Sequence, residues 1–210
     1  MFYLHHTPFW LRMLFPKGLI WEGPVAKGDE VYLTFDDGPH PDATPFVLDQ
    51  LDACGMKGTF FCIGKNVAKH PEIMADILKR GHAVGNHTMH HLNAKQATAD
   101  DYLKDVKEAA ELISSELFRP PYGQIRSAHA HAIRNAFPSM KLVMWSVLTG
   151  DFDTSRTGEQ CFAALRKNTR PGSIIVFHDS AKAFERLRVA LPLTLEWLKQ
   201  QGLTSSVLPD

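Results

Sequence analysis

The sequence predicts an α/β fold in which helices surround a parallel sheet that comes close to a closed barrel. Strand-like and helix-like segments alternate about seven times along the chain, as in folds built from repeated β/α units. Nearly every unusual polar residue directly follows a strand-like segment, which is where β/α barrels place their chemistry. The 210 residues, 44% of them hydrophobic, can bury the core of one such domain.

The first strand is the best defined element. Residues 31–39 read VYLTFDDGP, an alternating apolar run that ends in two carboxylates and a Gly-Pro pair. Helical spacing, closed by helix-stop glycines, then alternates with short apolar runs. The expected elements are a helix over 43–53, a strand over 58–63, a helix over 65–80, a strand over 82–86 and a helix over 100–117.

The second half of the chain continues this order. Two prolines in residues 119–123, which read RPPYG, forbid a helix and fix the backbone. The expected elements are then a helix over 124–137, a strand over 141–147, a polar break over 150–153, a helix over 158–168, a strand over 173–177, a helix over 181–201 and a strand over 204–208. No repeat or low-complexity linker interrupts them.

The charge balance and the cysteine count limit which substrates and binding partners the protein can have. Lys+Arg and Asp+Glu both number 23, so there is no basic field for nucleic acid or an anionic membrane. The substrate is therefore expected to be uncharged or only locally charged. Cys54, Cys62 and Cys161 are odd in number, which favours reduced thiols in a reducing compartment over a disulfide framework or a Cys-based zinc site.

Residues 1–20 are apolar and aromatic but interrupted by charges and prolines. They contain no span long enough to cross a membrane and lack the pattern of a signal peptide, so a cytoplasmic location is expected. We expect residues 1–30 to form an N-terminal segment that packs on the barrel through Phe9, Trp10 and Phe15, and residues 31–210 to form the catalytic domain. A short interfacial helix that touches a membrane is the alternative.

Asp36 and Asp37 stand at the tip of the first strand. Two adjacent like charges repel each other, so a fold that keeps both needs a cation between them or a proton on one. A polar turn is the alternative, because Asp, Gly and Pro are common turn residues.

His87 and His91 are a second candidate group. They are four residues apart, so in a helical turn both imidazoles face one metal, whereas His90 is a rival ligand at spacing three. With one carboxylate of the Asp pair they form a two-His, one-carboxylate set with open positions. Zinc suits these ligands, and iron, cobalt and nickel fit them as well.

The remaining polar residues can supply acid and base chemistry. The HTMHH segment has no Glu between its histidines, so the second carboxylate of the Asp pair is the candidate base. His178 at another strand tip is a candidate acid, and Asp151 can hold its tautomer and raise its pKa. With a backbone N–H for an oxyanion, these parts indicate a hydrolase.

Five motifs in order resemble those of the polysaccharide deacetylases, the NodB-homology domains of carbohydrate esterase family 4. They are TFDDG at 34–38, HTxxH at 87–91, RPPYG at 119–123, Asp151 after the WSV run, and IIVFHD at 174–179, and together they span most of residues 31–208. The resemblance implies a distorted (β/α)7 barrel and metal-dependent N-deacetylation of N-acetylhexosamine glycans, with acetate released.

The resemblance also implies roles for single residues. Asp36 is the expected base, Asp37, His87 and His91 are the expected Zn²⁺ ligands, Arg119 orients Asp36, Tyr122 offers its backbone N–H to an oxyanion, His178 is the acid and Asp151 supports it. For Arg119 and Tyr122 the alternatives are a surface ion pair and a packed aromatic residue.

Phe152, Val176 and Pro121 are expected to line the substrate pocket. In the resemblance to the polysaccharide deacetylases, Phe152 stands where that family usually has Trp and Val176 where it usually has Leu, which predicts a slightly roomier acyl pocket. Two other functions stay open: a non-catalytic carbohydrate-binding relative, and an amidohydrolase acting on a small non-sugar amide. The expected partner is an N-acetylated amino sugar.

Overall fold

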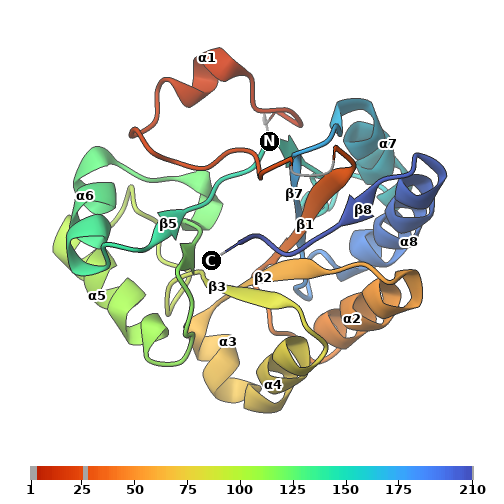
Figure 1. The fold of residues 1–210 in the computed structure, drawn as a ribbon. Helices are drawn as coiled ribbons and strands as arrows, with labels where there is room; N and C mark the ends of the chain where they lie inside the picture. Colours follow the sequence, from red (N-terminus) through yellow and green to blue (C-terminus); the bar gives the residue numbers. More distant parts are fainter. Residues whose placement is uncertain (1–3, 26–27, 210) are drawn as a thin grey trace.

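A curled parallel sheet with helices around its outer side forms the molecule (Figure 1). The computed structural model describes residues 4–25 and 28–209. The strand order is β5-β4-β3-β2-β1-β7-β6, and β8 pairs with the start of β1. The strands are β1 Glu30–Asp36, β2 Gly58–Cys62, β3 Ala83–Asn86, β4 Leu117–Phe118, β5 Lys141–Leu142, β6 Val147–Leu148, β7 Ile174–His178 and β8 Thr204–Ser205.

The expected parallel α/β fold is therefore confirmed. Among the described residues the end strands β5 and β6 do not pair with each other, so the barrel is incompletely closed. No helix in this part of the chain has the length and apolar character required to span a membrane.

Local sequence signals set most helix ends. Gly55, with φ 64°, ends α2, and Thr157 and Gln160 form a capping box at the start of α7. The helices are α1 Phe9–Arg12, α2 Ala43–Cys54, α3 Gly64–Lys69, α4 Pro71–Lys79, α5 Ala99–Ala110, α6 Ser127–Ala136, α7 Gly158–Asn168 and α8 Phe184–Gln200.

The predicted strand over 204–208 is shortened to Thr204–Ser205, and three predicted elements differ more from the structure. The helix over 65–80 is two helices, because Pro71 has no N–H to continue α3 and instead begins α4. The helix over 100–117 ends at Ala110, and β4 begins at Leu117. The strand over 141–147 is split into β5 and β6 at opposite ends of the sheet.

The split between β5 and β6 is explained by a tertiary contact with Arg119. The carbonyl oxygens of Val143 and Met144 accept hydrogen bonds from the buried guanidinium of Arg119, at 3.4 and 3.0 Å, instead of from a neighbouring strand. The chain therefore leaves the β5 ladder there and joins β7 only from Val147 onward.

The N-terminal segment crosses this gap. Ile20 pairs in parallel with Val143, and His6 pairs antiparallel with Val147. The predicted burial of Phe9 and Trp10 is wrong: they are 75% and 61% exposed. Backbone pairing, rather than the aromatic side chains of α1, holds this segment on the sheet. Residues 1–3 and 26–27 of the predicted segment lie outside the described residues.

Two neighbouring aromatic residues do pack inward as part of this segment. Phe15 lies edge-on against Trp21 with ring centroids 5.1 Å apart, and both join the hydrophobic cluster that also contains the buried Leu19. The predicted contact of Phe15 with the domain is therefore present.

The alternating directions of the side chains along β1 determine where Asp36 lies. Val31, Leu33 and Phe35 belong to the main hydrophobic cluster, which also contains buried residues of α2 and α8. Because successive strand residues face opposite sides, Thr34 and Asp36 point into the curled sheet. The carboxylate is therefore delivered to the inner face at the carboxyl end of a central strand.

Candidate active site

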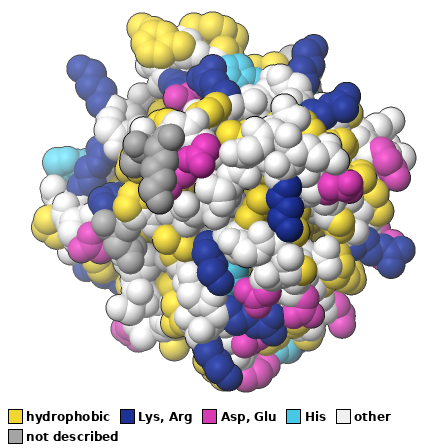
Figure 2. Space-filling view, turned by 45° about the vertical axis from the view of Figure 1, so that its right-hand side comes forward, with side chains coloured by type: hydrophobic (Ala, Val, Ile, Leu, Met, Phe, Trp, Pro, Cys, Tyr) yellow, Lys and Arg dark blue, Asp and Glu magenta, His cyan; other side chains and the backbone are white. Residues whose placement is uncertain are grey.

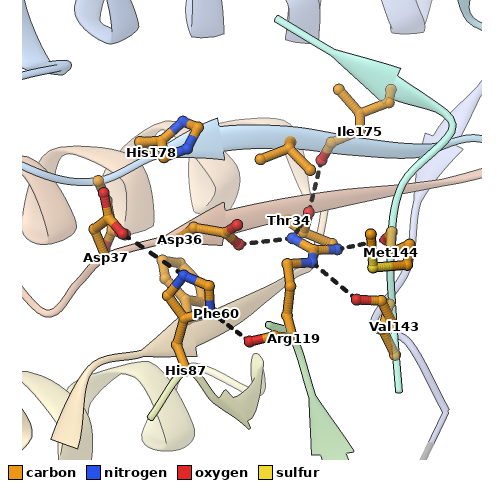
Figure 3. A network of polar contacts seen from close by, with 12 residues as sticks. Thr34, Asp36, Asp37, Phe60, His87, Arg119, Val143, Met144, Ile175 and His178 are labelled. Carbon is orange, nitrogen blue, oxygen red and sulfur yellow. Dashed lines mark hydrogen bonds and ion pairs between the residues drawn. The ribbon is translucent and has the colours of Figure 1, made fainter. Parts of the chain in front are cut away.

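Arg119 and Asp36 form a buried ion pair. Nη1 of Arg119 lies 2.6 Å from Oδ1 of Asp36 and donates to Thr34 Oγ1 at 2.7 Å (Figure 3). The guanidinium carbon lies 4.0 Å from the ring centroid of Phe61, which covers it. The side chains of Arg119 and Asp36 are 0% and 4% exposed. The alternative of a surface ion pair is therefore wrong, and Asp36 is held in one orientation.

Asp37 turns away from its neighbour Asp36. Its φ of 80° lies in the left-handed region, and Asn66 Nδ2 donates to its carbonyl oxygen at 2.7 Å. Its Oδ1 lies 3.2 Å from Nε2 of His91 and 3.7 Å from Nε2 of His87. Burial alone would raise the pKa of Asp37, but the contact with His91 and the surrounding histidine charges lower it well below its ordinary range.

His87 and His91 converge, but not on one face of a helix. The loop after β3 is irregular, and Thr88 and His91 have φ values of 65° and 55°. The two ring centroids are 5.1 Å apart. Nδ1 of His87 lies 2.7 Å from the Arg119 carbonyl oxygen, so Nδ1 carries the proton and Nε2 keeps a lone pair. Burial lowers the pKa of His87 to about 4, which keeps the ring neutral.

These residues fit a divalent metal. Asp37, His87 and His91 each place one ligand atom within 4.8 Å of the others. Oδ1 of Asp37 is buried and, among the described residues, forms no well-aligned hydrogen bond even though Nε2 of His91 lies 3.2 Å away, which suits an atom that binds a cation. His90, the rival ligand, instead holds Asp105, with 2.6 Å between Nδ1 and Oδ1. The donor set suits zinc and also iron, cobalt or nickel.

His178 and Asp151 form a second hydrogen-bonded pair. Nδ1 of His178 lies 2.7 Å from one carboxylate oxygen of Asp151, and the His178 backbone N–H donates to the other at 2.8 Å. His178 is the β7 partner of Asp36 in the ladder between β1 and β7. Burial would lower the pKa of His178, but the charge and hydrogen bond of Asp151 raise it to about 9.

Tyr122 faces the same site from the 3-10 turn Pro121–Gly123. Its φ is 59°, the residue is 58% exposed, and the centroid of its ring lies 4.5 Å from that of His91. It is therefore not a buried core aromatic. Within the described part of the chain, its N–H donates to no backbone carbonyl outside this turn. The donor predicted for an oxyanion is thus not used elsewhere in the backbone.

The three predicted pocket residues have different environments. The ring of Phe152 meets that of His178 edge-on at 5.3 Å. Val176 is buried, and alternation along β7 places it on the same inner face as His178. Pro121 is buried in the turn that carries Tyr122. A role in acyl recognition stays a prediction for all three.

Sequence reasoning missed Asp179. It is fully buried, accepts a hydrogen bond from the backbone N–H of Gly38 at 3.1 Å, and accepts another from Thr44 Oγ1 at 2.6 Å. A Cβ at Gly38 would collide with the Asp179 carboxylate, so this position requires Gly. Asp179 thereby fixes the loop that carries Asp37. Its place directly after His178 was the available signal.

Asp105 on α5 was missed as well. Its Oδ2 accepts the backbone N–H groups of Met89 and His90 at 2.9 and 3.0 Å. These amides lie between the two candidate ligand histidines. Asp105 therefore holds their loop in its irregular conformation, and only the tertiary contact between α5 and the loop reveals this.

Comparisons with known proteins agree with this geometry. The family profile described as polysaccharide deacetylase matches residues 24–137. A peptidoglycan-N-acetylglucosamine deacetylase of Bacillus cereus is 34% identical over 198 residues, covering 91% of this chain and 92% of that protein. A chitooligosaccharide deacetylase of Azorhizobium caulinodans is 33% identical over 156 residues, covering 71% and 73%.

Solved structures show the same fold. A crystal structure of a peptidoglycan N-acetylglucosamine deacetylase with 4-naphthalen-1-yl-N-oxidanyl-benzamide has a TM-score of 0.84 at 30% identity, over 97% of this chain and 95% of that one. A family 4 pseudoenzyme from Bacillus anthracis has a TM-score of 0.74 at 25% identity, over 89% and 66%.

Fold, site and relatives together define a hydrolase of the class that acts on carbon–nitrogen bonds. The chain belongs to the polysaccharide deacetylase family, which confirms the resemblance seen in the motifs. The relatives support removal of N-acyl groups from sugars as its activity.

Proposed function

We propose that this protein is a metal-dependent N-deacetylase that hydrolyses the acetamido group of N-acetylglucosamine units in peptidoglycan-like or chito-oligosaccharide glycans. The observation that carries the proposal is that three groups of residues meet at the carboxyl ends of the strands, on the inner side of the sheet. They are the cluster of Asp37, His87 and His91, the ion pair of Asp36 with Arg119, and the hydrogen-bonded pair of His178 with Asp151. Relatives with these substrates in their names support the sugar class.

Asp37, His87 and His91 would hold the metal, with zinc the preferred ion. When bound, the ion would polarise the amide carbonyl and lower the pKa of water. His87 is prepared for this role because its proton is held on Nδ1 by the Arg119 carbonyl.

Asp36 would act as the base. Arg119 occupies its Oδ1 at 2.6 Å, so Oδ2 would take the proton of the attacking water. The Tyr122 backbone N–H would donate to the oxyanion that develops on the carbonyl.

His178 would complete the reaction. Its Nδ1 is engaged by Asp151, so Nε2 would give a proton to the leaving amine as the carbon–nitrogen bond breaks. Water and the amide thereby become acetate and a free amino sugar.

An acetate-release assay tests the proposal. Metal-stripped and zinc-, cobalt- or nickel-loaded protein is given peptidoglycan, chito-oligosaccharides, free N-acetylglucosamine and a panel of small amides, with Asp36→Asn as the control. Metal-dependent release from the glycans supports the proposal. Release from non-sugar amides alone would identify an amidohydrolase, and binding of glycans without any release would identify a non-catalytic relative, as among the family's pseudoenzymes.

A further inference from the structure

Four apolar residues in α1 and the turn after it face the solvent. Phe9, Trp10, Met13 and Leu14, which we call the α1 apolar face, are 75%, 61%, 71% and 76% exposed. Phe9 and Trp10 lie in α1, and Met13 and Leu14 follow in the turn that continues it, so the four exposed side chains lie close together on the surface. Figure 2 shows hydrophobic side chains projecting at the top of the molecule, where Figure 1 places α1.

The opposite side of the turn is fixed to the protein. Nη2 of Arg12 pairs with Glu22 at 2.7 Å, its Nε donates to the Thr7 carbonyl at 3.2 Å, and its guanidinium lies over the ring of Trp21. The apolar face is therefore held outward by contacts, and does not result from a frayed end. This is the reverse of the orientation that a surface helix adopts when it stabilises its own core.

A basic pocket lies just beyond the patch along the chain, because Pro16 and Lys17, which line it, follow Leu14 by two and three residues. It is lined by Lys17, Ser127, His131 and Arg134 together with small residues and Pro16, and no lining residue is acidic. Nη2 of Arg134 is buried and has no acceptor within the described part of the chain. The first turn of α6 opens here, without an acid or a side-chain cap. Uncapped helix N–H groups and cations together favour an anion.

We propose that the α1 apolar face and this basic pocket form a docking surface for a lipid bilayer with anionic phosphate headgroups. Exposed aromatic and aliphatic side chains beside Lys and Arg are the composition of interfacial binding elements. The overall charge is zero, so attraction arises from this local arrangement rather than from the net charge.

A second copy of the chain fits this surface less well. A two-fold contact through α1 would bring the same basic residues of both copies into one interface. Phosphate headgroups instead supply the acceptor that Arg134 lacks, and the acyl region receives the four apolar side chains.

Vesicle co-sedimentation tests the proposal with the full chain. Wild type is expected to bind vesicles of equal parts phosphatidylcholine and phosphatidylglycerol, with a blue shift of the Trp10 emission identified by Trp10→Phe. Phe9→Ser with Trp10→Ser should weaken binding roughly tenfold or more. The matched control, Leu78→Ser with Leu112→Ser, removes two other exposed leucines and should change nothing.

The contribution of the basic pocket is tested separately. Lys17→Gln and Arg134→Gln should each weaken binding to anionic vesicles roughly fivefold, with wild-type melting temperature and acetate release retained. Should Arg134→Gln unfold the protein, Lys17→Glu alone tests the role of charge, and it should likewise weaken binding to anionic vesicles.

Four outcomes overturn the proposal. They are no vesicle binding, equal binding to pure phosphatidylcholine, binding of inorganic phosphate without vesicles, and a dimer in lipid-free sedimentation that Phe9→Ser dissociates.

Discussion

Nδ1 of His87 lies 2.7 Å from the backbone carbonyl oxygen of Arg119, whose guanidinium reaches Asp36. One residue thus positions both a candidate metal ligand and the candidate base. The first prediction separates those two functions.

Asp36→Asn should retain bound metal but lower acetate release about 10²- to 10⁴-fold, since the amide cannot accept the proton. Asp37→Ala should instead lose the metal and with it acetate release, and excess metal should partly restore both. Elemental analysis and acetate release are measured for both variants. An Asp36→Asn protein without metal, or a metallated and inactive Asp37→Ala protein, would require the two roles to be exchanged.

Arg119→Met should destabilise the protein by about 3–5 kcal/mol, because it leaves the Asp36 carboxylate buried without its partner. Urea unfolding measures the loss. The matched control is Arg119→Met combined with Asp36→Asn, which removes the orphaned charge and should recover part of the stability. Equal losses in the single and double variants would show that the ion pair contributes nothing beyond packing.

Asp151→Asn should lower the pKa of His178 from about 9 toward its ordinary value. The raised pKa stabilises the folded state below pH 6.5, and this contribution is lost as the pH rises toward 9. In the variant that alkaline loss should disappear. NMR titration of metal-free protein measures the pKa without the charge of a cation, and an unchanged pKa would contradict the role of Asp151.

His82 should make the fold sensitive to acid. Burial lowers its pKa to about 4, and its Nδ1 accepts the Gly58 N–H at 3.2 Å. The unfolded chain therefore binds one more proton between pH 6.5 and 4, and stability falls by up to about 1.4 kcal/mol per pH unit as the pH is lowered.

The variant His82→Asn should keep an acceptor for the Gly58 N–H. It should reduce the dependence of the free energy of unfolding on pH by the equivalent of about one bound proton. Unfolding measured between pH 4.5 and 7.5 reports it, with exposed His131→Asn as the control. Identical slopes for wild type and His82→Asn would exclude His82 as the acid-sensitive group.

Among its side chains, the buried ones of the N-terminal segment should stabilise the domain and the exposed ones should not. Leu19→Ala should cost about 2–5 kcal/mol, as expected for a buried leucine. Phe9→Ala, at a residue 75% exposed, should leave the melting temperature almost unchanged. If both variants melt like wild type, residues 4–25 are an appendage and not part of the folded unit.

The sequence by itself determined the parallel α/β class and the polar residues at the strand ends. The alternation in VYLTFDDGP and the short apolar runs 58–63 and 173–177 carry that information locally, because burial on one or both faces of a strand sets their pattern. The ordered motifs identified the family and the candidate ligands, Asp37, His87 and His91. The residue roles remain the subject of the predictions above.

Only the tertiary structure decided how these residues are held. The loop of His87 and His91 is irregular because Asp105 from α5 binds its amides, and β5 and β6 separate because Arg119 takes the carbonyls of Val143 and Met144. The predicted burial of Phe9 and Trp10 was wrong because it too depends on tertiary structure. Hydrophobicity shows that a side chain favours burial, but it does not show which surface is available to cover that side chain.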